Sequence, residues 1–361
     1  EKLNGNFRLS VVDEERSWVL ADEAGHSYFI TLKSGQFKVS RSTINAYSVA
    51  ASLSVGGGSA GISISGAGAI ALNVVLTETR SFIENSHVTS AGDVLLSATS
   101  NSEISAIIAA ASASVGAGSS AGVGVSIGIS FAWNFIGYDA YGQDADGGVR
   151  AYVSDSSIYA AGALTQTAIA NQTISSLVFA FSAAIAAGSS AGVGASGSGV
   201  WAENKIGIDV EASIDGDGET GDGGISATSI TLTASDTSTI ASVAGAASVS
   251  FAFGSGAGVS ISVGVALSSN AIATSVAAFI KNADTGVTSR TGSIDISASS
   301  NAIINSIAAA ASIAIGAGGG AGVSVSGAGA VAQNVILTAT NAYIQNSVVN
   351  SADDVTIDAS S

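Results

Sequence analysis

Large apolar residues alternate with small residues along the glycine-rich stretches of the chain. The large residues that follow Gly122 are Val123, Val125, Ile127, Ile129, Phe131 and Trp133. The positions between them hold Gly, Ser and Ala, Asn134 follows on the same face, and the stretch after Gly258 repeats this alternation. A period of two is typical of a β-strand, because successive side chains point to opposite faces. We therefore expect strands with one face of large residues and one face so small that another sheet can approach closely.

One glycine-rich motif occurs five times. Its Ala-Gly pair ends at Gly61, Gly122, Gly192, Gly258 and Gly322, in steps of 61, 70, 66 and 64 residues. An asparagine follows twelve residues after each glycine, at Asn73, Asn134, Asn204, Asn270 and Asn334. A finer spacing of 33 residues, as between Asn101 and Asn134, divides each repeat into two half-repeats. The sequence predicts five tandem repeats of about 61–70 residues over 42–361, preceded by an atypical N-terminal coil or cap over 1–41.

Two all-β architectures fit this repeat. In a repetitive β-solenoid, similar to a parallel β-helix, each half-repeat forms one coil, which gives about ten coils stacked at about 4.8 Å. The alternative is a long-stranded antiparallel β meander, in which the half-repeats run up and down. The five asparagines favour the solenoid, because equivalent positions of stacked coils can form an internal ladder of side-chain amide hydrogen bonds.

Composition excludes several classes of function. The 361 residues include 27 acidic and 11 basic side chains, a formal net charge of -16, which argues against a nucleic-acid partner. The chain has no Cys, so thiolate metal sites and thiol nucleophiles are absent. Residues 106–133 are long and uncharged enough to cross a membrane as a helix, but their many glycines disfavour helix, and we expect no transmembrane segment. No signal peptide is visible, and a chain that begins at Glu1 is expected to be a fragment or a processed product.

The most suggestive chemistry lies in one acidic segment, residues 215–224. Its carboxylates, spaced by glycines, are Asp215, Asp217, Glu219 and Asp222. Two interpretations stand: a loop that binds calcium through oxygen ligands, or a solvated acidic loop. The segment lacks the EF-hand pattern, since its twelfth position is Ser226. No other metal or cofactor is expected.

We expect no enzyme. Only His26 and His87 are available as histidines, and no serine elbow is followed by an acid and a histidine in hydrolase order. Solenoids also carry polysaccharide lyases and hydrolases, so a glycan-acting β-helix enzyme is the alternative. Neighbouring carboxylates such as Asp353 and Asp354 point to opposite faces of a strand. General acid–base catalysis by a pair of carboxyl groups needs both on one face, which argues against this alternative.

Three sequence blocks resemble a known family. They are Val-x-Leu-x-Ala-x-Ser at 94–100, the glycine-rich stretch at 115–128, and Ala-Tyr-Val or Ala-Tyr-Ile at 151–153 and 342–344. Over residues 42–361 they are similar to repeat regions of giant bacterial adhesin-like, or haemagglutinin-like, surface proteins. The resemblance implies a secreted, cell-surface β-helical stalk and transfers no catalytic residue. Expected partners are further repeats of a longer parent chain, other copies joined end to end or laterally into filaments, and cell-surface glycans.

Overall fold

Most of the protein is β-strand in the part that the structure describes. This computed structural model describes residues 8–13, 17–21, 27–31, 40–145, 147–218 and 223–361. Near the N-terminus, β1 (Arg8–Asp13), β2 (Ser17–Ala21) and β3 (Ser27–Thr31) pair as a small antiparallel sheet. From Ser40 onward, inter-strand pairing along the stack is parallel. The expectation of an all-β fold with parallel, stacked strands is confirmed.

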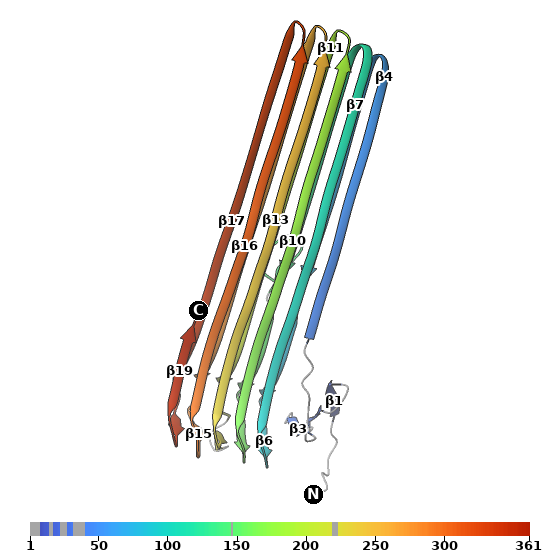
Figure 1. Ribbon diagram of the computed structural model, residues 1–361. Coiled ribbons are helices and arrows are strands. Elements are labelled where there is room, and N and C mark those ends of the chain that lie inside the picture. Colours follow the sequence, from blue (N-terminus) through green and yellow to red (C-terminus); the bar gives the residue numbers. More distant parts are fainter. Residues whose placement is uncertain (1–7, 14–16, 22–26, 32–39, 146, 219–222) are drawn as a thin grey trace.

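Each coil is a long, flat loop of chain with two straight sides. One coil rises along β10 (Leu164–Gly188), reverses at Ser189 and Ser190, and returns along β11 (Ala191–Asp215). It then crosses its base through β12 (Ile225–Ala227) and enters the next coil at β13 (Ile230–Gly254). The reversals lie together at one end of the molecule, which we call the tip (Figure 1). The opposite end, with the short crossing strands, is called the base.

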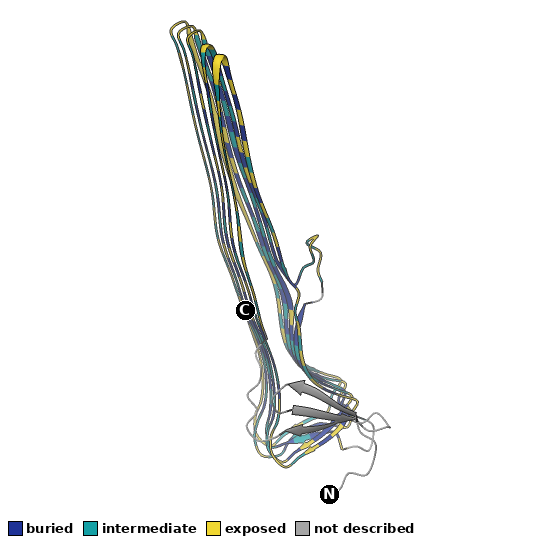
Figure 2. Ribbon diagram, turned by 90° about the vertical axis from the view of Figure 1, so that its right-hand side faces the viewer, coloured by how far each residue is buried: buried dark blue, intermediate teal, exposed yellow. Residues whose placement is uncertain are grey.

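Stacked coils produce three sheets (Figures 1 and 2). The ascending sheet holds the first parts of β4 (Ser40–Val75) and β7 (Val94–Ile136), then β10, β13, β16 (Ile294–Gly318) and β19 (Val355–Ser360). The descending sheet holds the second parts of β4 and β7, with β5 (Glu78–Glu84), β8 (Gly148–Ser154), β11, β14 (Ala257–Lys281) and β17 (Ala321–Gln345). The base sheet holds β6 (His87–Ser90), β9 (Ser157–Ala160), β12, β15 (Val287–Ser289) and β18 (Val349–Ser351).

The coil is twice as long as the sequence spacing predicted. Strand β10 pairs with β13 in unbroken register, so that Ile174 lies beside Ile240, and β11 pairs with β14 in the same way. The two half-repeats of one repeat do not stack on each other; they face each other in opposite sheets. The residues from Ser40 onward therefore form five coils and the start of a sixth, not about ten. At about 3.3 Å per residue the 25-residue strands are about 80 Å long, whereas five coils rise only about 24 Å.

The interior between the two long sheets becomes thinner toward the tip. Near the base it holds branched side chains such as Ile214, Ile225 and Leu232, all fully buried. Near the tip the inward positions are Gly, Ala and Ser. A Cβ atom placed on Gly122 would lie 2.2 Å from the carbonyl oxygen of Ala187 in the facing sheet. The expectation that a face of small residues permits close approach of a second sheet is met here by direct backbone contact.

Candidate functional site: the internal asparagine ladder

The five predicted asparagines lie in one row inside the descending sheet. Each occupies the same register position in its coil, and each of the first four donates a side-chain hydrogen bond from Nδ2 to Oδ1 of the next. The four successive distances, in the order Asn73, Asn134, Asn204, Asn270 and Asn334, are 2.8, 2.7, 2.8 and 2.9 Å. All four bonds point the same way along the stack, so the ladder has a direction.

The ascending sheet supplies hydroxyl groups to this ladder. Asn134 Nδ2 also lies 3.2 Å from Ser176 Oγ, and Asn204 Nδ2 lies 3.1 Å from Ser242 Oγ. Both asparagines are fully buried, so an unmet amide group would be costly there. The ladder therefore ties each coil to the next and also ties the two sheets together.

A second set of polar contacts joins the sheets closer to the tip. Serine hydroxyls face each other across the interior at 2.5–2.7 Å in four coils; the pairs are Ser52–Ser65, Ser112–Ser126, Ser248–Ser262 and Ser312–Ser326. In the remaining coil, Ser196 instead contacts Ser262 of the next coil at 3.2 Å. Sequence reasoning missed these pairs. A signal was present, since the two serines of a pair are separated by 13 or 14 residues about each tip reversal.

One carboxyl group is buried in the same interior. Asp236 is 1% exposed, and Ser238 Oγ donates to its Oδ1 at 2.8 Å. Burial raises the pKa of Asp236 from 3.8 to about 6, and hydroxyl contacts from Ser238, Thr274 and Ser300 oppose the rise. The only other carboxylate within the described interior lies in the base loop, at Asp217.

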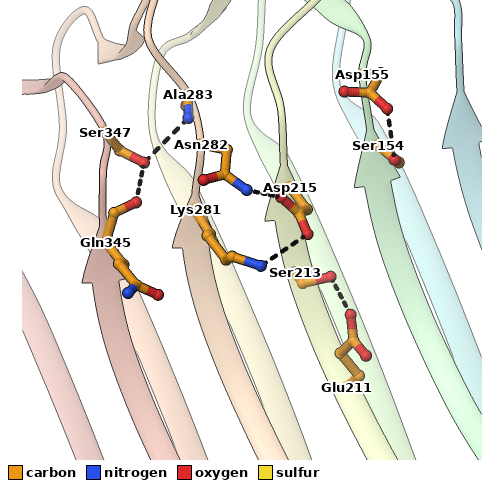
Figure 3. Close-up of polar contacts among 10 residues, drawn as sticks. All are labelled: Ser154, Asp155, Glu211, Ser213, Asp215, Lys281, Asn282, Ala283, Gln345 and Ser347. Carbon is orange, nitrogen blue, oxygen red and sulfur yellow. Dashed lines mark hydrogen bonds and ion pairs between the residues drawn. The ribbon is translucent and has the colours of Figure 1, made fainter.

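The acidic segment lies at the base, where the structure describes half of its predicted ligands. Asp215 Oδ1 accepts a hydrogen bond from Asn282 Nδ2 at 2.7 Å, and its Oδ2 lies 3.5 Å from Lys281 Nζ (Figure 3). Asp217 is 1% exposed and accepts a hydrogen bond from the backbone N–H of Gly286. Glu219 and Asp222 lie outside the described residues. The two described carboxylates thus bind the neighbouring coil.

Gly216 and Gly218 give this loop its shape. Their φ angles are 86° and 89°, in the left-handed region that favours glycine. Within the described residues, no group of three or more His, Asp or Glu side chains is placed to hold a metal ion. The same part of the chain contains no helix long and apolar enough to cross a membrane.

No family model, curated protein or solved structure matches this chain. The geometry of the site is a continuous, directional hydrogen-bond ladder, buried except at Asn334, along a stack of nearly identical coils. Its chemical role is cohesion between coils.

Proposed function

We propose that this chain is a structural segment of a secreted or cell-surface fibre, related in kind to the adhesin-like repeat proteins that its sequence resembles. The observation that carries the proposal is the asparagine ladder, which joins five coils through side-chain amide groups, all of them buried except that of Asn334. A row of this kind gives a stiff stack, because bending it would pull apart hydrogen bonds that no water can replace.

The ladder is open at both ends. Among the described residues nothing donates to Oδ1 of Asn73, and nothing accepts from Nδ2 of Asn334. The backbone edges are open as well, since β4 pairs with a neighbour on one side only and so does β17. An added coil at the C-terminal end would receive the bond that Asn334 can donate. Growth would therefore be head to tail, either within a longer parent chain or between copies.

The remaining parts of the proposal concern where the protein is located and what it binds. Extracellular location, contact with cell-surface glycans and calcium at residues 215–224 are proposed from the sequence resemblance and from the acidic composition. A glycan-acting enzyme would need several carboxylates converging on one exposed face. The described carboxylates of the acidic segment instead contact Lys281, Asn282 and Gly286, which favours the structural proposal.

The test is negative-stain electron microscopy with one matched pair of variants. The wild-type chain should form fibres that lengthen with concentration. Asn334→Asp keeps the oxygen that accepts from Asn270 but removes the outward donor, so fibres should shorten or disappear. Gln333→Asp adds the same charge one residue away, on the outward face, and should leave them intact. Discrete particles of constant size at every concentration would refute end-to-end assembly.

A further inference from the structure

The distal half of the coils carries no charge. Residues 42–77, 104–138, 156–202, 237–280 and 296–352 contain no Asp, Glu, Lys or Arg, so every described charged group lies toward the base. Toward the tip the inward residues are small and the large apolar residues point outward, whereas farther from the tip Ile108 and Val178 still point inward and are fully buried. Phe179 and Phe181, in the middle coil, are both 43% exposed. This distribution is the reverse of that in an ordinary soluble protein.

On the ascending sheet these outward residues form a ridged surface, which we call the apolar face. One ridge crosses the five strands through Tyr47, Ile107, Leu177, Val243 and Ile307, which share a register. A second ridge, eight residues closer to the tip, includes Val55, Ile185 and Phe251. Between the ridges lies a shallow apolar groove lined by small residues such as Ala111, Ala247 and Ala311. Three larger side chains rise from its floor, those of Val49, Phe179 and Phe181. The ring of Phe179 lies over Gly245.

We propose that a second copy of this chain covers the apolar face. This inference deepens the proposed function, because it names the surface through which stacked segments would associate laterally. Five strands spaced at about 4.8 Å and about ten residues of each give roughly 24 Å by 33 Å, or about 800 Å². That area exceeds the largest apolar patch of a typical monomer, about 300–600 Å². It equals the roughly 800 Å² that each partner contributes to a standard stable interface.

Shape and charge both favour a two-fold arrangement. An isologous contact needs a surface that complements itself. On this face the two phenylalanine side chains stand beside a groove floor of alanine and glycine. A two-fold axis that lies in the plane of the interface, perpendicular to the strands, lets Phe179 and Phe181 of each copy pack over the small residues of the other. The same axis turns the two bases in opposite directions. The described charged groups, most of which are acidic, then stay far apart.

The experiment uses the full chain with Asn334→Asp, so that end-to-end growth does not obscure lateral pairing. Sedimentation should show a particle of twice 34.8 kDa. The double change Phe179→Glu and Phe181→Glu should weaken association by at least about tenfold, since it places four carboxylates in the interface. The matched control, Thr165→Glu with Thr167→Glu, changes outward residues of the same strand outside the apolar face and should have no effect.

Cross-linking provides a readout that does not depend on how the glutamate variants fold. The chain has no Cys, so Ala111→Cys marks the apolar face alone, and a bismaleimide should join two copies there but not through Thr167→Cys. Particles of single mass would overturn the proposal, as would a dimer that survives both glutamates or cross-links only through residue 167. So would uptake of the monomer by phosphatidylcholine vesicles that depends on the phenylalanines, which would assign the face to lipid. Fibres formed by the wild-type chain would leave the proposed function standing in each case.

Discussion

Close contact between the two long sheets predicts a large effect from one added methyl group. Gly122 and Gly197 both lie in the descending sheet, and neither has a positive φ angle. A Cβ at Gly122 would meet the carbonyl oxygen of Ala187 at 2.2 Å, whereas a Cβ at Gly197 would meet nothing within 4 Å. Gly122→Ala and Gly197→Ala are therefore chemically identical changes. They differ in whether the added methyl group would collide with the backbone of the facing sheet.

The magnitude follows from how far the sheets must move. A non-bonded carbon and oxygen need more than 3 Å, so the sheets would separate locally by about 1 Å. Overpacking of this kind costs about 1–3 kcal/mol. The Ser112–Ser126 pair, 2.6 Å long and four residues from Gly122 on the descending side, would also stretch beyond hydrogen-bond distance, at about 1 kcal/mol. We expect Gly122→Ala to destabilise the protein by about 3 kcal/mol.

The control should move in the opposite direction. Alanine restricts the unfolded chain more than glycine does, so Gly197→Ala should stabilise by about 0.5 kcal/mol. Thermal unfolding followed by circular dichroism measures both variants against the wild type. Equal melting temperatures for the two variants would refute the idea that backbone contact sets the thickness of the interior.

Three further changes test the interior and the base. Asn204→Leu breaks the ladder on both sides, because Asn270 Oδ1 loses its donor and Asn134 Nδ2 keeps only its contact with Ser176, so it should cost about 2–4 kcal/mol. Asn171→Leu, in an exposed amide pair, should cost less than about 1 kcal/mol. Similar losses in urea unfolding would contradict a special role for burial. The raised pKa of Asp236 means that its stability contribution is complete below about 4 and is lost as pH rises through about 6. Asp236→Asn should therefore stabilise at pH 8 by up to about 3 kcal/mol and have little effect at pH 3.5, and a pH-independent difference in melting temperature would exclude this account. If the loop at 215–224 binds calcium, the ion should raise the melting temperature and a chelator should reverse the rise; no change in either direction removes that prediction.

Much of the local structure follows from the sequence alone. The alternation after Gly122 identifies a strand and separates its two faces, because side chains on a strand point to opposite sides whatever the fold. The five asparagines, each twelve residues after a glycine, identify equivalent positions, and equivalent positions stack in any parallel array. Both features depend only on spacing along the chain, which a single sequence records in full.

The length of the coil was decided by the tertiary structure. A spacing of 33 residues fits a short coil stacked on the next, and it fits equally the two sides of one long coil. In short coils Asn134 would be the stacked neighbour of Asn101, whereas in long coils that neighbour is Asn171, and the structure shows the bond to Asn171. The long coil forms because strands one full repeat apart match residue for residue and can hydrogen-bond along their whole length. Which face lies inside was decided in the same way. Two sheets that touch through backbone at Gly122 leave no room for Phe or Ile between them, so the large side chains must point outward.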